Sequence, residues 1–243
     1  MKMTALAVRN TKEILRDPLN VVFGIGFPVV VLLLLSAIQA NVPVDLFKIE
    51  NITPGITVFG LSFITLFSAT VISKDRSGAL LQRLYTAPLG PTDFIISYTL
   101  PVVPIAIAQS VICYAVALML GLKPSVNILY ALVFIIPVSL LFISLGLLFG
   151  SVLNDKQVGG ICGAMLTNLT AWLSGTWFDL ELVGGAFKRV AYALPFVHAV
   201  EMERALLEGN FAGIFPHIWW VLGYTAFSMA VAVLLFLRQM KKQ

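Results

Sequence analysis

The sequence predicts an all-α integral membrane protein with six transmembrane helices, and three observations support this fold class. Hydrophobic residues make up 59% of the 243 positions and charged residues only 12%, against roughly 45–50% and 25% in ordinary soluble domains. Several uncharged stretches reach the length of about 20 apolar residues that a helix needs to cross the hydrocarbon core. The basic residues lie between these stretches and form no patch, so they indicate membrane topology and not nucleic-acid binding.

Residues 1–20 precede the first span and predict an amphipathic helix. On a helical wheel, apolar side chains such as Leu6 and Ile14 share one arc, and charged side chains such as Arg9 share another. This pattern is typical of a helix that lies in the membrane interface. Pro18 then ends the helix, because the residue before a proline disfavours the helical conformation.

We expect residues 1–243 to form one transmembrane domain. Its six spans fall within residues 21–40, 54–73, 94–122, 126–154, 157–178 and 218–237. Pro101, Pro104 and Pro137 kink the third and fourth spans, which is tolerated where neighbouring helices or water satisfy the freed carbonyls. Residues 179–217 mix apolar and charged side chains and contain the pair Gly184-Gly185 and Pro195. For this part we expect a partly re-entrant segment, or an extracellular helix, that caps the exit.

The distribution of basic residues predicts the orientation in the cell (plasma) membrane. If the N-terminus is cytoplasmic, eleven of the sixteen Lys and Arg residues face the cytoplasm. They are Lys2, Arg9, Lys12, Arg16, Lys74, Arg76, Arg83, Lys156, Arg238, Lys241 and Lys242. The positive-inside rule therefore places both termini of this multi-pass chain in the cytoplasm.

Several kinds of chemistry find no support in the sequence. It contains no G-x-x-x-x-G-K-[ST] phosphate loop, so we expect no ATP site in this chain. None of the six expected spans contains an ionisable Asp, Glu, Lys, Arg or His, which disfavours ion-coupled transport. His198, Glu201 and Glu203 are spaced i, i+3 and i+5, so they do not share one helical face, and we expect no metal site. We also expect no catalytic residue and no cofactor in this chain.

The stretch between the second and third expected spans contains a short amphipathic pattern. Leu80, Leu81, Leu84 and Tyr85 fall at i, i+1, i+4 and i+5, which predicts one apolar stripe on a helix that ends before Pro88. A short amphipathic helix of this kind can dock into a groove of a partner protein. A loop that lies on lipid headgroups explains the same pattern.

Four motifs carry a resemblance to a known family. They are Arg16-Asp-Pro-Leu, Pro54-Gly, Arg83-Leu-Tyr-Thr-Ala-Pro-Leu and the segment from Ala193 to Gly209. In this order they resemble the type-2 ABC transporter permeases, the membrane-spanning subunits of ABC exporters of the drug and antibiotic type. The resemblance covers nearly the whole chain. It implies a partner ABC ATPase subunit that holds ATP and Mg²⁺, and a dimer with a second copy of the chain or a similar permease.

The resemblance also implies which residues dock on the ATPase. The stretch 77–86 would be the cytoplasmic coupling helix, with the N-terminal amphipathic helix beside it. Its docking residues would be Ser77, Leu80, Leu81, Arg83, Leu84, Tyr85 and Thr86. The family usually has Glu directly before the glycine that matches Gly78, whereas this chain has Arg76-Ser77, and Asp75 is the nearest acid.

In related exporters the translocation path runs between two six-span units and is lined by the second and fifth spans. The matching residues here are Phe63, Thr65, Phe67, Ser68, Met165, Asn168, Leu169 and Trp172. The fifth span is also the most polar of the six, and hydrogen bonds between helices explain that polarity equally well. Gly159 and Gly163 form a G-x-x-x-G that favours close helix packing over ligand contact.

The expected function is therefore that of a permease subunit that moves a hydrophobic or amphipathic compound outward when its ATPase subunits close. Two other functions remain open from the sequence. One is an ATP-independent secondary carrier or channel. The other is a membrane-embedded transferase, which the sequence disfavours because it lacks clustered acids and bases at a membrane face.

Overall fold

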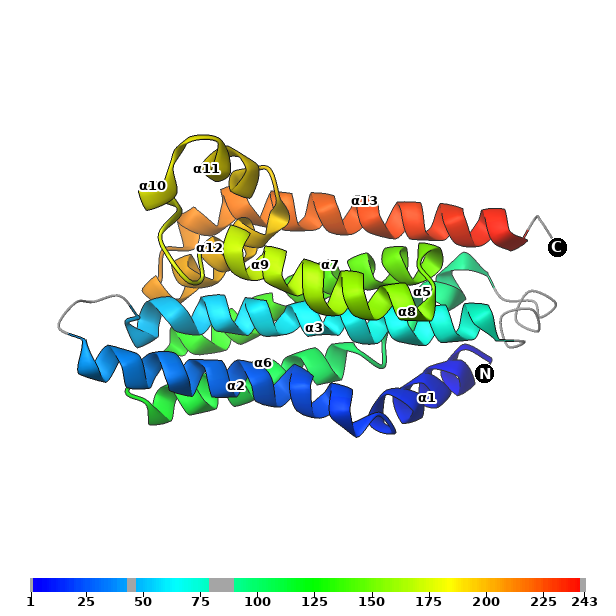
Figure 1. Ribbon diagram of the computed structural model, residues 1–243, viewed down its shortest axis with the longest axis horizontal. Coiled ribbons are helices and arrows are strands. Elements are labelled where there is room, and N and C mark those ends of the chain that lie inside the picture. Colours follow the sequence, from blue (N-terminus) through cyan, green and yellow to red (C-terminus); the bar gives the residue numbers. More distant parts are fainter. Residues whose placement is uncertain (1, 43–46, 79–89, 241–243) are drawn as a thin grey trace.

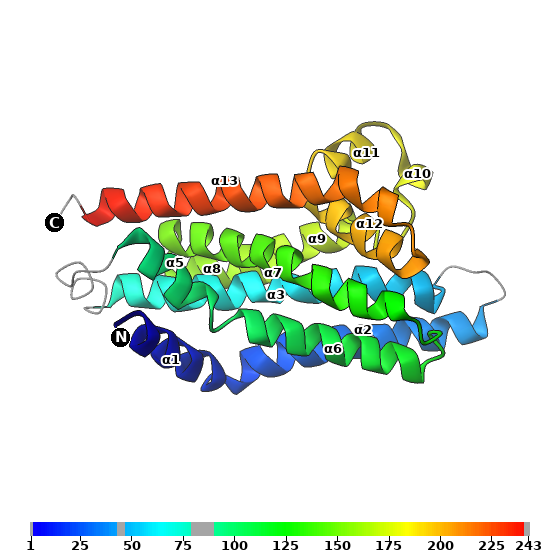
Figure 2. The same cartoon turned by 180° about the vertical axis from the view of Figure 1, so that it is seen from behind.

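The computed structural model describes residues 2–42, 47–78 and 90–240, and within them every regular element is a helix. The helices form an elongated bundle (Figure 1). Both termini lie at one end of this bundle, called the terminal end below, and α10–α12 lie at the opposite end, called the far end (Figure 1). Seen from behind, α6 runs alongside α2 (Figure 2), with which it is in contact.

The helices have the following bounds: α1 Lys2–Leu15, α2 Pro18–Asn41, α3 Ile49–Ser77, α5 Pro91–Thr99, α6 Val103–Met119, α7 Val126–Val152, α8 Asp155–Val158, the π-helix η1 Gly159–Leu166, α9 Thr167–Leu173, α10 Leu180–Val183, α11 Gly185–Tyr192, α12 Pro195–Glu208, the 3₁₀-helix η2 Phe211–Gly213, and α13 Ile214–Met240.

Within the described residues, five helical stretches are long and apolar enough to cross a membrane: Val22–Asn41, Ile49–Ser77, Ile95–Met119, Val126–Val152 and Phe211–Arg238. They coincide with the first four and the last of the spans that the sequence predicts. The third contains the expected break, because α5 ends at Thr99 and α6 begins at Val103, with Pro101 in the turn between them and Pro104 in the first turn of α6.

The predicted fifth span corresponds to α8, η1 and α9, which follow one another without a loop. The junction residues Gly159 and Thr167 both have helical backbone angles, so the three pieces form one continuous helical path. The wider π turns divide it, and Thr167 donates its hydroxyl hydrogen to the Cys162 carbonyl five residues earlier. The path ends before Gly175, whose φ of +71° is readily adopted only by glycine. No single piece reaches the length of a span, so a sixth crossing stays a prediction.

The core is built around α3, the most buried of the five stretches, and α7 packs most closely against it. Glycines on α7 make this approach possible. A Cβ atom at Gly150 would lie 2.8 Å from the Ala69 carbonyl oxygen, and one at Gly146 would lie 2.8 Å from the Thr65 carbonyl oxygen. Any larger residue at these two positions would separate the helices, since the contacting atoms belong to the α3 backbone.

The far end is closed by α12 and by a small hairpin formed by α10 and α11. Helix α12 packs against α13, α7 and α3 and buries one apolar face that includes Phe196, Val200 and Leu206. The hairpin turns at Gly184 and Gly185, both with positive φ, and closes over a separate small cluster of Leu173, Leu180, Ala191 and Val197.

Candidate functional site

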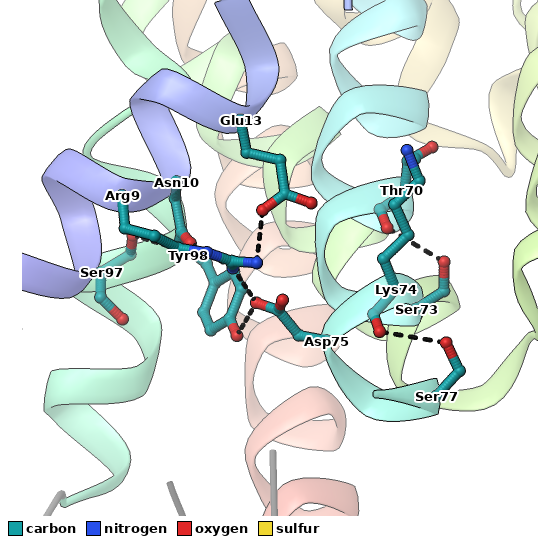
Figure 3. Close-up of polar contacts among 10 residues, drawn as sticks. All are labelled: Arg9, Asn10, Glu13, Thr70, Ser73, Lys74, Asp75, Ser77, Ser97 and Tyr98. Carbon is teal, nitrogen blue, oxygen red and sulfur yellow. Dashed lines mark hydrogen bonds and ion pairs between the residues drawn. The ribbon is translucent and has the colours of Figure 1, made fainter. Parts of the chain in front are cut away.

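A buried carboxylate near the C-terminal end of α3 connects this helix to two others. Asp75 lies in the last turns of α3, and its side chain is only 2% exposed. Its Oδ2 atom accepts a hydrogen bond from Arg9 Nη1 on α1 at 2.5 Å and one from the Tyr98 hydroxyl on α5 at 2.7 Å. Figure 3 shows Arg9 and Tyr98 reaching Asp75 from these two helices. A buried carboxylate needs such partners, because an unpaired charge in the protein interior is strongly unfavourable.

Two further residues of α1 complete this group. Asn10, also buried, donates from Nδ2 to the Ser97 carbonyl of α5 at 3.0 Å and accepts a hydrogen bond from Arg9. Glu13 forms a second ion pair with Arg9. We call Arg9, Asn10, Glu13, Asp75 and Tyr98 the Asp75 cluster. It fixes α1 against α3 and α5, which are distant from it in the sequence.

The next residue, Arg76, points to a different helix. Its guanidinium donates to the Ser151 carbonyl and, at 2.5 Å, to the Leu153 carbonyl, both at the end of α7. The carbonyls at a helix C-terminus lack intrahelical partners and carry partial negative charge, so a cation there is favourable. Asp75 therefore attaches the end of α3 to α1 and α5, and Arg76 attaches it to α7.

The stretch predicted to dock on an ATPase is described in part. Of its seven predicted docking residues, Ser77 is described, and it is exposed, with its hydroxyl bonded to the Lys74 carbonyl at 3.0 Å. Leu80, Leu81, Arg83, Leu84, Tyr85 and Thr86 lie outside the described residues. On the other side, Asp93 accepts a hydrogen bond from the Gly90 amide at 3.0 Å and caps α5. Asp75 faces α1 and α5, so this acid is used within the chain.

The predicted path residues of the fifth span lie together on one face. Met165 is 53% exposed, Leu169 40% and Trp172 56%, and Asn168 is also exposed. Their spacing places them along one side of η1 and α9. We call these four residues the outer stripe. It presents mostly apolar surface, and the Asn168 amide bonds to the Ala164 carbonyl of its own helix at 2.8 Å.

The predicted path residues of the second span are more enclosed. Phe63 is half-buried and packs edge-on against Phe59, with ring centroids 5.9 Å apart. Thr65 is buried and donates to the Phe142 carbonyl of α7 at 2.8 Å. Phe67 packs where Gly24 of α2 leaves room, and Ser68 lies against Gly146 of α7. All four side chains contact other helices of the same chain, since the Phe63 ring also packs edge-on against Phe27 of α2 at 5.8 Å.

The polar residues of the fifth span differ in their partners. Besides the Thr167 bond to its own helix, the Ser174 and Thr176 hydroxyls bond to each other at 2.6 Å. The Thr170 hydroxyl is buried without a partner in the described part of the chain.

The two glycines of the G-x-x-x-G motif differ in their packing. A Cβ at Gly163 would touch Leu66 at 3.3 Å, whereas one at Gly159 would meet nothing within 4 Å.

The three residues with a possible metal-ligand character have different partners. They are His198, Glu201 and Glu203. His198 Nδ1 lies 2.9 Å from His217 Nδ1, and Glu201 pairs with Arg204 at 2.9 Å. Glu203 is fully buried and accepts a hydrogen bond from the Tyr114 hydroxyl of α6 at 3.1 Å. Its other oxygen has no partner among the described residues.

Sequence reasoning did not anticipate the Tyr114–Glu203 pair or the Asp75 cluster. A signal for each was present: Asp75 lies two residues after the end of an apolar span, and Glu203 interrupts an apolar face of α12. Such positions place a charge where only another side chain can solvate it.

Comparisons with known proteins agree with this architecture. Residues 1–207 match the family model described as ABC-2 type transporter. The chain is 28% identical over 233 residues to a protein of Pyropia yezoensis named as a transport permease, ycf38, covering 90% of this chain and 79% of that protein. It is 26% identical over 250 residues to the protein of the same name from Porphyra purpurea, covering 97% and 84%. The chain therefore belongs to the ABC-2 type transporter family, whose members are membrane components of transporters.

Proposed function

We propose that this chain is the permease subunit of an ABC exporter. Two six-span units form the translocation path, and separate ATPase subunits dock on the stretch 77–86 of each unit. ATP and Mg²⁺ bind to the ATPase, and the permease performs no covalent chemistry. Both termini are cytoplasmic, α1 lies in the membrane interface, and the run from α8 to α9 is the fifth span. The exported compound is hydrophobic or amphipathic.

The Asp75 cluster is the observation that supports this proposal most directly. The stretch 77–86 begins where α3 ends, directly beside Asp75 and Arg76. Through these two residues the end of α3 is bonded to α1, α5 and α7. Movement of a docked ATPase would therefore be transmitted to several spans at once, as a permease driven from outside the bilayer requires.

The outer stripe supports the dimeric path. Met165, Leu169 and Trp172 are large apolar side chains that stay exposed on a run adjoining the central helix α3. Two such stripes facing each other would line a path with apolar and weakly polar surface, which suits a hydrophobic or amphipathic compound. The half-buried Phe63 of α3 would extend the same lining.

The first test is purification of the tagged chain from its native membrane in mild detergent, followed by mass spectrometry of its partners. The proposal expects an ATPase with a phosphate loop at a one-to-one ratio to the permease. A chain that is repeatedly recovered as a lone oligomer, with transport that persists after ATP depletion, would contradict it.

One observation favours the alternative of an ATP-independent carrier. Such a carrier needs an ionisable group within the bundle, and Glu203 of α12 is an acid buried against the spans. Transport assayed in sealed vesicles discriminates the two functions. Export that requires ATP inside and continues without a proton gradient supports the ABC exporter, whereas export that a proton gradient alone sustains supports the carrier.

A further inference from the structure

A cleft at the far end of the bundle has the size and lining of a ligand site. It lies between the start of α3, the turn from Gly175 to Asp179, and α12, and its volume is about 570 Å³. Pockets for drug-sized ligands occupy roughly 300–1,000 Å³. We call it the far-end cleft.

Aromatic side chains form much of its wall. Phe47 lies just before α3, Trp177 and Phe178 come from the turn after α9, and Tyr192 comes from the end of α11. None of these four rings is fully buried. Aromatic faces attract cations as well as apolar groups, because the ring quadrupole is negative above its plane.

The charged residues of the lining offer acceptors. Arg204 is the only base among the described lining residues, and it is bonded within the protein: Nη1 donates to Glu201 at 2.9 Å and Nη2 to the Gly175 carbonyl at 2.8 Å. Asp179 uses one oxygen to accept from the Glu181 amide at 2.9 Å. The second carboxylate oxygens of Asp179 and Glu201 have no hydrogen-bond partner in the described part of the chain.

Lys188 lies close to one wall of the cleft, and it is also occupied. It pairs with Glu181 and lies 5.7 Å from the centre of the Tyr192 ring. The cleft thus combines two partly free carboxylates with aromatic walls and leaves no uncommitted cation on its described lining. A cation would find both acceptors and ring faces there, whereas an anion would lie beside two carboxylates.

Two rows of rings connect the cleft to the residues proposed for the path. Trp172 of the outer stripe packs against Phe178 with centroids 5.9 Å apart. Phe63 packs against Phe59, and Phe59 against Trp177 at 5.8 Å. Each row begins at a predicted path residue and ends at a wall of the cleft. A compound that moves along the outer stripe toward the far end would arrive at this cleft.

We propose that the far-end cleft binds an amphipathic organic cation, with its positive group beside Asp179 and Glu201 and its apolar body against Trp177 and Phe178. The class of exported compounds is then restricted to lipophilic cations. The cleft is the last site that they occupy before release. The place of the cleft in transport rests on the proposed function, but the binding itself does not.

The test is binding of tetraphenylphosphonium to the full-length chain in lipid nanodiscs, with empty nanodiscs to subtract partition into lipid. Tetraphenylborate, an anion of the same shape, is the matched ligand control. We expect saturable binding of the phosphonium and none of the borate. Asp179→Asn should weaken phosphonium binding about fivefold, since it removes one nearby charge. Asparagine still caps α10, so the fold is kept.

Two more variants complete the design. Glu208→Gln changes an exposed acid on the same helix as Glu201 that does not line the cleft, and it should leave binding unchanged. Phe178→Leu should weaken binding while keeping apolar volume. Equal binding of the two ions, absence of saturable phosphonium binding, or an Asp179→Asn variant that binds like the original chain would overturn the inference. Because no ATPase is needed, these results are independent of whether an ATPase co-purifies.

Discussion

Arg9 and Asp75 are 66 residues apart in the sequence, yet Arg9 Nη1 and Asp75 Oδ2 lie 2.5 Å apart. This pair connects the N-terminal helix to the end of α3, directly before the stretch proposed to dock on an ATPase. Arg9 is 39% exposed and Asp75 only 2%, so the carboxylate depends on Arg9 and Tyr98 for its solvation. Removal of either side chain should therefore lower the free energy of unfolding more than removal of one member of an exposed ion pair would.

Asp75→Asn should destabilise the chain by about 1–3 kcal/mol, because the buried side chain loses charge-assisted hydrogen bonds from Arg9 and Tyr98. Thermal unfolding in detergent, followed by intrinsic fluorescence, measures this change. Glu13→Gln is the matched control, since Glu13 pairs with the same Arg9 at 27% exposure, and its cost should stay below about 1 kcal/mol. Equal losses of stability in the two variants would show that the burial of Asp75 does not strengthen its contribution.

Leu84→Asp combined with Tyr85→Asp should separate the permease from its ATPase, because two charges would replace the apolar stripe predicted to dock. Co-purification should be lost, and the ATPase activity of the membrane complex should no longer respond to transported compound. Asn41→Ala changes an exposed residue at the far end of α2, outside the predicted docking residues, whose amide bonds to the Ala37 carbonyl of its own helix, and this variant should keep the partner. A double variant that still binds the ATPase and transports at the original rate would refute the docking prediction.

Glu203→Gln should alter how stability depends on pH. Burial raises the pKa of Glu203 from its ordinary value of 4.5 to about 8. Between these two values the folded chain keeps a proton that the unfolded chain has lost. The free energy of unfolding therefore decreases as pH rises through this window, by about 1.4 kcal/mol per unit of pH at most.

Melting temperatures of the original chain should accordingly fall between pH 5 and pH 8, and those of Glu203→Gln should fall less. Glu208→Gln, at an exposed position of the same helix, should follow the original chain. If Glu203→Gln and the original chain show the same slope, Glu203 is already ionised in the folded state and the prediction is wrong.

Gly150→Ala should destabilise the chain by roughly 1–3 kcal/mol, because its Cβ would meet the α3 backbone 2.8 Å from the Ala69 carbonyl oxygen. Gly159→Ala adds the same atom where nothing lies within 4 Å, and it should be neutral or slightly stabilising. Unfolding in detergent compares the two. Comparable losses of stability would show that the fit between α7 and α3 is looser than described.

The sequence predicted the helical class and the positions of five spans because hydropathy and length depend on local composition. It also predicted the interruption between α5 and α6, since Pro101 and Pro104 act on their own backbone. The π-helix η1 was not predicted, because a run rich in glycine is apolar whether its hydrogen bonds are of the α or the π type. Hydropathy could not detect the division of the fifth stretch for the same reason.

The contacts of the candidate site were harder to predict than the helices that carry it. Asp75 was considered only for contact with a partner protein, and its pairing with Arg9 depends on how α1 turns back beside α3. Likewise, Glu203 was considered with His198 as a metal ligand, but the rotation of α12 directs Glu203 to Tyr114 and His198 to His217. Helix rotation and the order of neighbours arise from tertiary packing, which a single sequence does not display.

The divergence of Asp75 and Arg76 has a mechanical consequence for α3. Adjacent residues on a helix point about 100° apart, and here each is bonded to a different part of the bundle. Rotation of α3 about its own axis would break one set of bonds whichever way it turned. Torque applied at the end of this helix is therefore resisted, and the displacement that remains is a tilt or a translation that carries α1, α5 and the end of α7 along with it.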